Sequence, residues 1–179
     1  ASGETVNLDI LSFKNVVGTE YWLLDAGVDL TGKITLKYRG EDFADTRLAD
    51  VLEGRLSDDK KVQHLKVVRA LENRKLTWVG ASGDTWNLRE KNKWKLPDSS
   101  LTQFAPGDAV VFTRDNVGDV NVNKGGVVVA GMEITGGTFV FKGGEIVSAA
   151  DKETNYTPAT RKMELSGNAD ATFEESVKL

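Results

Sequence analysis

The chain lacks cysteine altogether and has one histidine and three prolines among its 179 residues. Without cysteine there can be no disulfide framework, thiolate nucleophile, Cys-based zinc site or iron–sulfur cluster. A single histidine excludes a histidine-rich metal site within one chain, although carboxylate-only Ca²⁺ sites stay open. The absence of cysteine also suits a protein that has to stay unfolded while it crosses a membrane.

Long hydrophobic runs are missing as well. The longest are residues 109–112 and 127–130, far short of the roughly 18 residues of a membrane helix. No basic region followed by an apolar core marks a signal peptide. The formal net charge is −4, which gives no basic footprint for nucleic acid or an anionic membrane. We therefore expect no nucleic-acid partner and no direct membrane insertion by this segment.

Glycine, by contrast, is abundant, with 18 residues. Valine-rich runs of strand length alternate with turn signals that contain Gly and Asn, most clearly between residues 110 and 147. The run centres Val111, Val122, Ile134 and Ile146 lie 11, 12 and 12 residues apart. Two steps make about 23 residues, close to one coil of a right-handed β-helix. The sequence therefore predicts an all-β fold, and within it a fragment of a right-handed parallel β-helix, a solenoid. A sandwich or barrel is the alternative, because regular turn signals suit those folds too.

The patterns divide the chain into two parts. Residues 1–75 are predicted to form strand-rich N-terminal rungs, and residues 76–179 to form β-helix rungs. The first part contains a charged insert, residues 40–61. A hairpin is predicted at its end, formed by residues 65–69 and 75–79.

The charged insert departs from the strand pattern. Leu48, Val51, Leu52 and Leu56 have the spacing of the apolar face of an amphipathic helix. We therefore predict a short helix around residues 46–56, with a surface insertion between strands as the alternative.

Three tryptophans, Trp78, Trp86 and Trp94, recur every eight residues. Exposed tryptophans stack on sugar rings, which makes Trp86 and Trp94 the candidate ligand-binding residues. The competing interpretation is that these side chains pin a loop rich in Gly and Asn onto the core, since tryptophan buries much area per residue.

Residues able to carry catalysis are sparse. His64 has no evident acid or nucleophile beside it, and Ser82 lacks the flanking residues of a serine-protease loop. Asp115 and Asp119, with the asparagines around them, are conceivable Ca²⁺ ligands, but solvated Asx turns explain them as well. Asn155 begins a formal glycosylation sequon. We expect no catalytic residues, no metal and no cofactor.

An ordered series of motifs carries a family resemblance. In sequence order they are LTWVG (76–80), DTWN (84–87), NKW (92–94), FAPGDAVVF (104–112), VVVAGMEI (127–134) and FVFKGGEI (139–146). This series resembles a module in the passenger domains of bacterial autotransporters, the surface proteins of type V secretion. The resemblance covers about residues 76–147.

The resemblance implies a right-handed β-helix displayed outside a Gram-negative cell. The segment would be secreted to the cell surface and attached through an outer-membrane barrel that this chain does not contain. Its function would be non-catalytic: a rigid stalk, or an adhesive surface for a host protein or glycan or for contact between cells. The alternatives are a segment that assists folding and export without a ligand of its own, and a β-helix enzyme acting on polysaccharides.

Overall fold

The computed structural model describes residues 5–149 and 163–174. These residues form β-strands, one short 3₁₀ turn at Arg114–Asn116 and no α-helix, which confirms the all-β class. No helix in these ranges has the length and hydropathy to cross a membrane. The strands are β1 (Val6–Ile10), β2 (Glu20–Asp25), β3 (Ile34–Tyr38), β4 (Glu41–Asp42), β5 (Leu52–Leu56), β6 (Val62–Val67), β7 (Lys75–Trp78), β8 (Asp84–Trp86), β9 (Trp94–Lys95), β10 (Leu101–Thr102), β11 (Asp108–Phe112), β12 (Gly118–Val122), β13 (Val127–Ile134), β14 (Gly137–Gly143), β15 (Ile146–Ser148), β16 (Met163–Leu165) and β17 (Ala169–Phe173).

The chain divides into two compact units, residues 1–71 and 72–179. The predicted division between residues 75 and 76 falls within β7, and this strand belongs wholly to the second unit.

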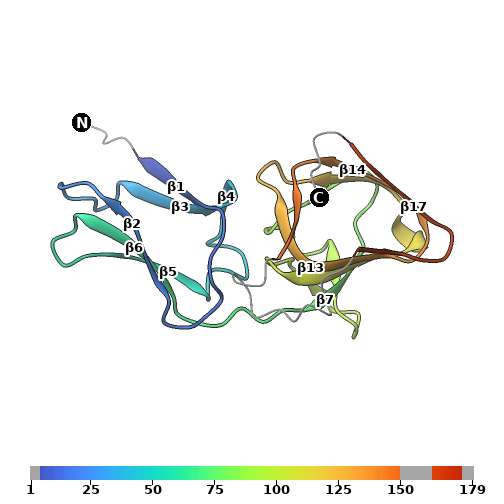
Figure 1. Cartoon of the computed structure of the whole chain (residues 1–179), viewed down its shortest axis with the longest axis horizontal. Coiled ribbons are helices and arrows are strands. Elements are labelled where there is room, and N and C mark those ends of the chain that lie inside the picture. Colours follow the sequence, from blue (N-terminus) through green and yellow to red (C-terminus); the bar gives the residue numbers. More distant parts are fainter. Residues whose placement is uncertain (1–4, 150–162, 175–179) are drawn as a thin grey trace. The chain divides into compact units, whose positions relative to one another are not determined.

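The first unit consists of two three-stranded sheets (Figure 1). One has the order β1-β3-β4, with β1 parallel to β3, and the other has the antiparallel order β2-β6-β5. Alternation along β6 explains how the second sheet is oriented. Gln63, Leu65 and Val67 are buried, whereas His64 and Lys66 between them are half-buried and lie on the opposite face.

Close packing ties this unit together. A Cβ built on Gly54 of β5 would meet Leu36 of β3, so the two sheets approach each other closely there. Asn15 is buried, and its side-chain amide donates to the carbonyl oxygen of Leu71 and accepts from the Leu71 N–H. This pair of hydrogen bonds fixes the segment before β2 to the end of the unit.

The charged insert, residues 40–61, does not contain the predicted helix. Residues 44–51 form consecutive turns, and β5 follows at once. Leu48 and Val51 are buried in the core of the unit. Their spacing therefore reflects the packing of a compact turn. Asp42 and Thr46 accept local backbone N–H bonds there, in the manner of Asx and Ser/Thr turns.

The predicted hairpin between residues 65–69 and 75–79 is also wrong. β6 pairs with β2 and β5, whereas β7 pairs with β9 and β11 in a different sheet. The hairpin of this region is instead formed by β5 and β6, joined by residues 57–61. Asp59 makes that turn favourable, because its carboxylate accepts from the Ser57 hydroxyl and from the Lys61 N–H.

The second unit is built from two ladders of parallel strands. One ladder runs through β7, β11 and β13 to β15 and β16, and the other runs through β8, β12, β14 and β17. Paired strands in each ladder are separated along the chain by at least one strand of the other ladder, because parallel neighbours need a crossover connection. At the β7 side, β9 and β10 add antiparallel pairs, so that sheet is mixed.

Aromatic side chains fill the interior of the second unit. Phe112 lies at the centre of this cluster, with ring centroids 5.1–5.9 Å from those of its five aromatic neighbours. The cluster is formed by Trp78, Trp86, Trp94, Phe104, Phe112, Phe139, Phe141 and Phe173. These rings connect the two parallel ladders into one hydrophobic core.

Candidate binding face

Trp86 and Trp94, the candidate ligand-binding residues, lie inside the second unit. Both side chains are 0% exposed. Their ring centroids are 5.2 Å apart, and both rings contact Phe104 and Phe112. A ring without exposed surface cannot stack on a sugar, so the ligand-binding interpretation of these residues is incompatible with the structure. They are core residues.

The other chemistry-bearing residues have structural partners. The Ser82 hydroxyl accepts from the Asp119 N–H, and the Asp119 carboxylate accepts from Lys142 at 2.8 Å. Asn121 donates to the carbonyl oxygen of Gly83. Within residues 5–149 and 163–174, no group of three or more His, Asp or Glu is arranged to hold a metal ion. Asn155 lies outside the described residues.

Asp84 and Lys93 form a half-buried ion pair in the second unit. Lys93 Nζ lies 2.7 Å from Asp84 Oδ2, and both side chains are less than a third exposed. The same oxygen accepts from the Ala81 N–H. The hydrogen bond from Lys93 is the main reason that the pKa of Asp84 is lowered. This pair holds the turn at residues 81–84 in place.

One surface does combine an exposed aromatic ring with charged groups. It is the outer face of the β2-β6-β5 sheet, which we call the Trp22 face. It consists of Glu20, Trp22 and Asp25 on β2, Val62, His64 and Lys66 on β6, and Glu53 and Arg55 on β5. The strand register places six of these residues in two rows across the sheet, Trp22-His64-Arg55 and Glu20-Lys66-Glu53, and pairs Asp25 with Val62 beside them. Residues directly opposite in register project to the same face.

Trp22 projects into solvent from this face. Its side chain is 78% exposed. Its ring meets the His64 ring edge to face, with centroids 5.2 Å apart and an interplanar angle of 65°. His64 therefore supports one side of the indole and leaves the remainder accessible.

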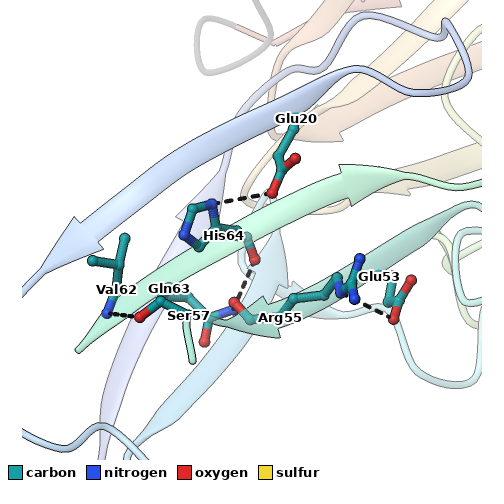
Figure 2. A network of polar contacts seen from close by, with 7 residues as sticks. All are labelled: Glu20, Glu53, Arg55, Ser57, Val62, Gln63 and His64. Carbon is teal, nitrogen blue, oxygen red and sulfur yellow. Dashed lines mark hydrogen bonds and ion pairs between the residues drawn. The ribbon is translucent and has the colours of Figure 1, made fainter. Parts of the chain in front are cut away.

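Figure 2 shows the polar contacts around His64. His64 Nδ1 lies 3.1 Å from Glu20 Oε1, at ion-pair distance but without hydrogen-bond geometry. On β5, Arg55 Nε lies 3.6 Å from Glu53 Oε1, and both side chains are about half exposed. The Arg55–Glu53 pair is thus solvent-accessible, whereas the His64 side chain is largely buried and its Nδ1 is enclosed beside Glu20.

The opposite face and the turn hold the sheet rigid beneath these groups. The side-chain amide of Gln63 donates to the carbonyl oxygens of Arg55 and His64, at 3.0 and 2.8 Å. The Ser57 hydroxyl accepts from the Val62 N–H and donates to Asp59, and this second bond lowers the pKa of the Asp59 carboxyl. The backbone that carries Arg55 and His64 is therefore fixed by hydrogen bonds from within (Figure 2).

The sequence analysis did not single out Trp22. Tyr21, Trp22, Leu23 and Leu24 form one apolar run, which is typical of a buried strand. The signal that distinguishes Trp22 is its phase: Glu20 lies two residues away and therefore on the same face of the strand. Tyr21 and Leu23 lie on the other face and line a cavity of about 280 Å³ within the first unit.

Comparisons with protein-family models, with curated proteins and with solved structures find no match for this chain.

Proposed function

We propose that this chain is a non-catalytic segment of the passenger domain of a bacterial surface protein of the autotransporter type. In this proposal the second unit is part of a right-handed parallel β-helix. The segment acts as a rigid stalk that also carries an adhesive surface toward a host molecule or another cell.

The observation that carries the proposal is the pair of parallel ladders in the second unit. Val110 pairs with Leu76 on one side and with Met132 on the other, and Met132 pairs in turn with Met163. The steps along this ladder, from residue 76 to 110, 110 to 132 and 132 to 163, are 34, 22 and 31 residues, within the roughly 20–50 residues of repeat architectures. Stacked repeats bury a continuous core and leave long faces free, which suits a stalk.

The arrangement of the motifs supports the same proposal. Asp108 of the FAPGD sequence begins β11, and Gly107 just before it adopts a φ of 84°, which favours glycine. The tryptophans of the LTWVG, DTWN and NKW sequences all enter the aromatic core. The residues of these motifs therefore have structural roles, in turns and in the core, as expected for a repeating structural module.

Surface display tests the proposal. The whole chain, tagged at its N-terminus, would be carried as the passenger of an autotransporter barrel in a Gram-negative host. We expect antibody labelling of intact cells and a protease-resistant fragment that spans the second unit. Retention of the chain inside the cell, or complete digestion at the surface, would contradict the proposal.

The two alternatives give different results in the same cells. An export aid without a ligand predicts normal display and no gain in adhesion or aggregation over cells that display the barrel alone. An enzyme predicts release of reducing ends from a polysaccharide, abolished by substitution of a single carboxylate. We expect a gain in adhesion and no turnover.

A further inference from the structure

Trp22 has the most exposed large apolar side chain among the described residues, at 78%. Leaving so large an aromatic surface in water forgoes the free energy that its burial would give. The backbone beneath it is fixed in the sheet through the pairing of Trp22 with His64. The ring is therefore presented by a rigid support, which reduces the ordering cost of binding a ligand.

The surroundings of Trp22 are mostly polar. The Trp22 face carries three carboxylates, Glu20, Asp25 and Glu53, and two permanent cations, Arg55 and Lys66, beside the apolar Val62. The face therefore has no excess of positive charge. Its charged side chains can exchange hydrogen bonds with a ligand, because carboxylates accept bonds and the two cations donate them.

This composition selects among ligand classes. A protein partner needs a desolvated core within roughly 800 Å² of surface per side, and here a single aromatic ring stands among charges. A polyanion such as nucleic acid or a sulfated polysaccharide needs an excess of cations, which the face does not have. A neutral sugar needs an aromatic ring under its apolar C–H face and polar groups around its hydroxyls, and this surface provides both.

We propose that the Trp22 face binds a neutral oligosaccharide, with one hexose ring stacked on Trp22 and its hydroxyl groups hydrogen-bonded by Glu20 and Arg55. The three strands span about 10 Å, since adjacent strands lie about 4.8 Å apart. This width accommodates two linked sugar rings across the row Trp22-His64-Arg55. The inference rests on the proposed adhesive function and names its ligand class and its binding residues.

The test uses the purified full chain on a glycan array that carries neutral hexose and N-acetylhexosamine oligomers beside sulfated and sialylated ones. We expect binding to at least one neutral oligomer. We also expect this oligomer to change the tryptophan fluorescence in titration. That change reports on Trp22, because Trp78, Trp86 and Trp94 are at most 1% exposed.

Three variants make the test specific. Trp22→Ala should weaken binding at least tenfold, and Trp22→Phe should keep part of it. Leu101→Ala is the matched control, since Leu101 is also an exposed large apolar residue, at 59%, but lies in the second unit. It should bind like the wild type. Far-UV circular dichroism checks that all three variants are folded.

Three outcomes would overturn the inference: no neutral oligomer binds, only sulfated or sialylated glycans bind, or Trp22→Ala binds as tightly as the wild type. These results concern the ligand alone. Failure of the proposed function would be seen separately, as failure of the wild-type chain to reach the cell surface. Trp22→Ala should reach the surface normally, because its side chain is outside both cores.

Discussion

Asp108→Ala should destabilise the second unit selectively. The Asp108 side chain is fully buried at the start of β11. Its Oδ2 accepts from the Ala105 N–H at 2.8 Å, and its Oδ1 accepts from the Arg74 N–H at 2.9 Å. The Arg74 carbonyl oxygen accepts in turn from the Ala109 N–H. The carboxylate therefore connects the beginnings of two neighbouring parallel strands, β7 and β11.

The magnitude follows from the burial of these two bonds. The Ala105 N–H is buried and would lose its acceptor in the alanine variant, which costs about 1–3 kcal/mol. The Arg74 N–H is partly buried, and losing its bond costs about 0.5–1.5 kcal/mol. We expect a total loss of about 2–4 kcal/mol in the free energy of unfolding of the second unit. That is a large share of the 5–15 kcal/mol typical of a domain.

Urea unfolding followed by tryptophan emission measures this loss. The three tryptophans of the second unit are buried, so their emission shifts to the red when that unit unfolds. Asp115→Ala is the matched control, because Asp115 is exposed on the 3₁₀ turn. It should change stability by no more than about 0.5 kcal/mol. If Asp108→Ala were as stable as Asp115→Ala, the structural role assigned to the Asp108 carboxylate would be refuted.

Three further substitutions test other parts of the structure. Gly144→Val places a side chain against backbone atoms of Asn123 and Gly126 and should lower the free energy of unfolding by about 3 kcal/mol or more, measured by thermal unfolding. An unchanged melting curve would contradict the close approach of Gly144 to this turn. Asp84 has a lowered pKa in the folded state because Lys93 donates a hydrogen bond to it. The ionised carboxyl therefore stabilises the fold at pH values above the unfolded pKa of about 3.9. This stabilisation is lost as the pH falls through the lower pKa of the folded state. The stability difference between wild type and Asp84→Asn should accordingly be largest at neutral pH and shrink below about pH 4; a constant difference from pH 7 to pH 3 would contradict the pair. Asn15→Ala leaves a backbone N–H and a carbonyl without their side-chain partner and should cost the first unit about 1–3 kcal/mol, seen as faster hydrogen exchange in β6; unchanged exchange would count against the anchor.

The strand content of the second unit could be predicted because its signals are local. Runs of β-branched residues and the glycines between them mark the strands from β11 to β15 to within a few residues. Val111 and Ile134, two predicted steps apart, lie on strands that the structure pairs, with Val111 opposite Glu133. The next step was misleading, because Val122 pairs with Gly143 in β14, whereas Ile146 pairs with Val127. Uneven turn lengths shift the register, and spacing alone does not reveal them.

The errors in the first unit come from patterns that have two physical causes. Leu48 and Val51 are spaced as on a helix face, yet a compact turn buries them equally well. The strands β6 and β7 are separated by residues 68–74, a connection of hairpin length, yet β6 pairs with β2 and β5, and β7 pairs with β9 and β11. In both cases tertiary pairing decides between local alternatives of similar energy.

The candidate site shows the same limit. Burial of Trp86 and Trp94 was one of two interpretations, and only packing against Phe104 and Phe112 distinguishes them. Trp22 belongs to an apolar run in the sequence. Its neighbours His64 and Arg55 come from other strands and are placed beside it only by the pairing across the sheet. Residues that act through neighbours on other strands leave little trace in a single sequence.

The most direct test of the account is protease treatment of intact cells that display the whole chain from an autotransporter barrel. Wild-type and Asp115→Ala chains should label at the surface and leave a resistant fragment that contains residues 72–149. Asp108→Ala should leave less of that fragment at equal expression, because its second unit is less stable. A wild-type chain that stays inside the cell, or that is digested completely at the surface, would contradict the claim that this segment is a folded, surface-displayed passenger.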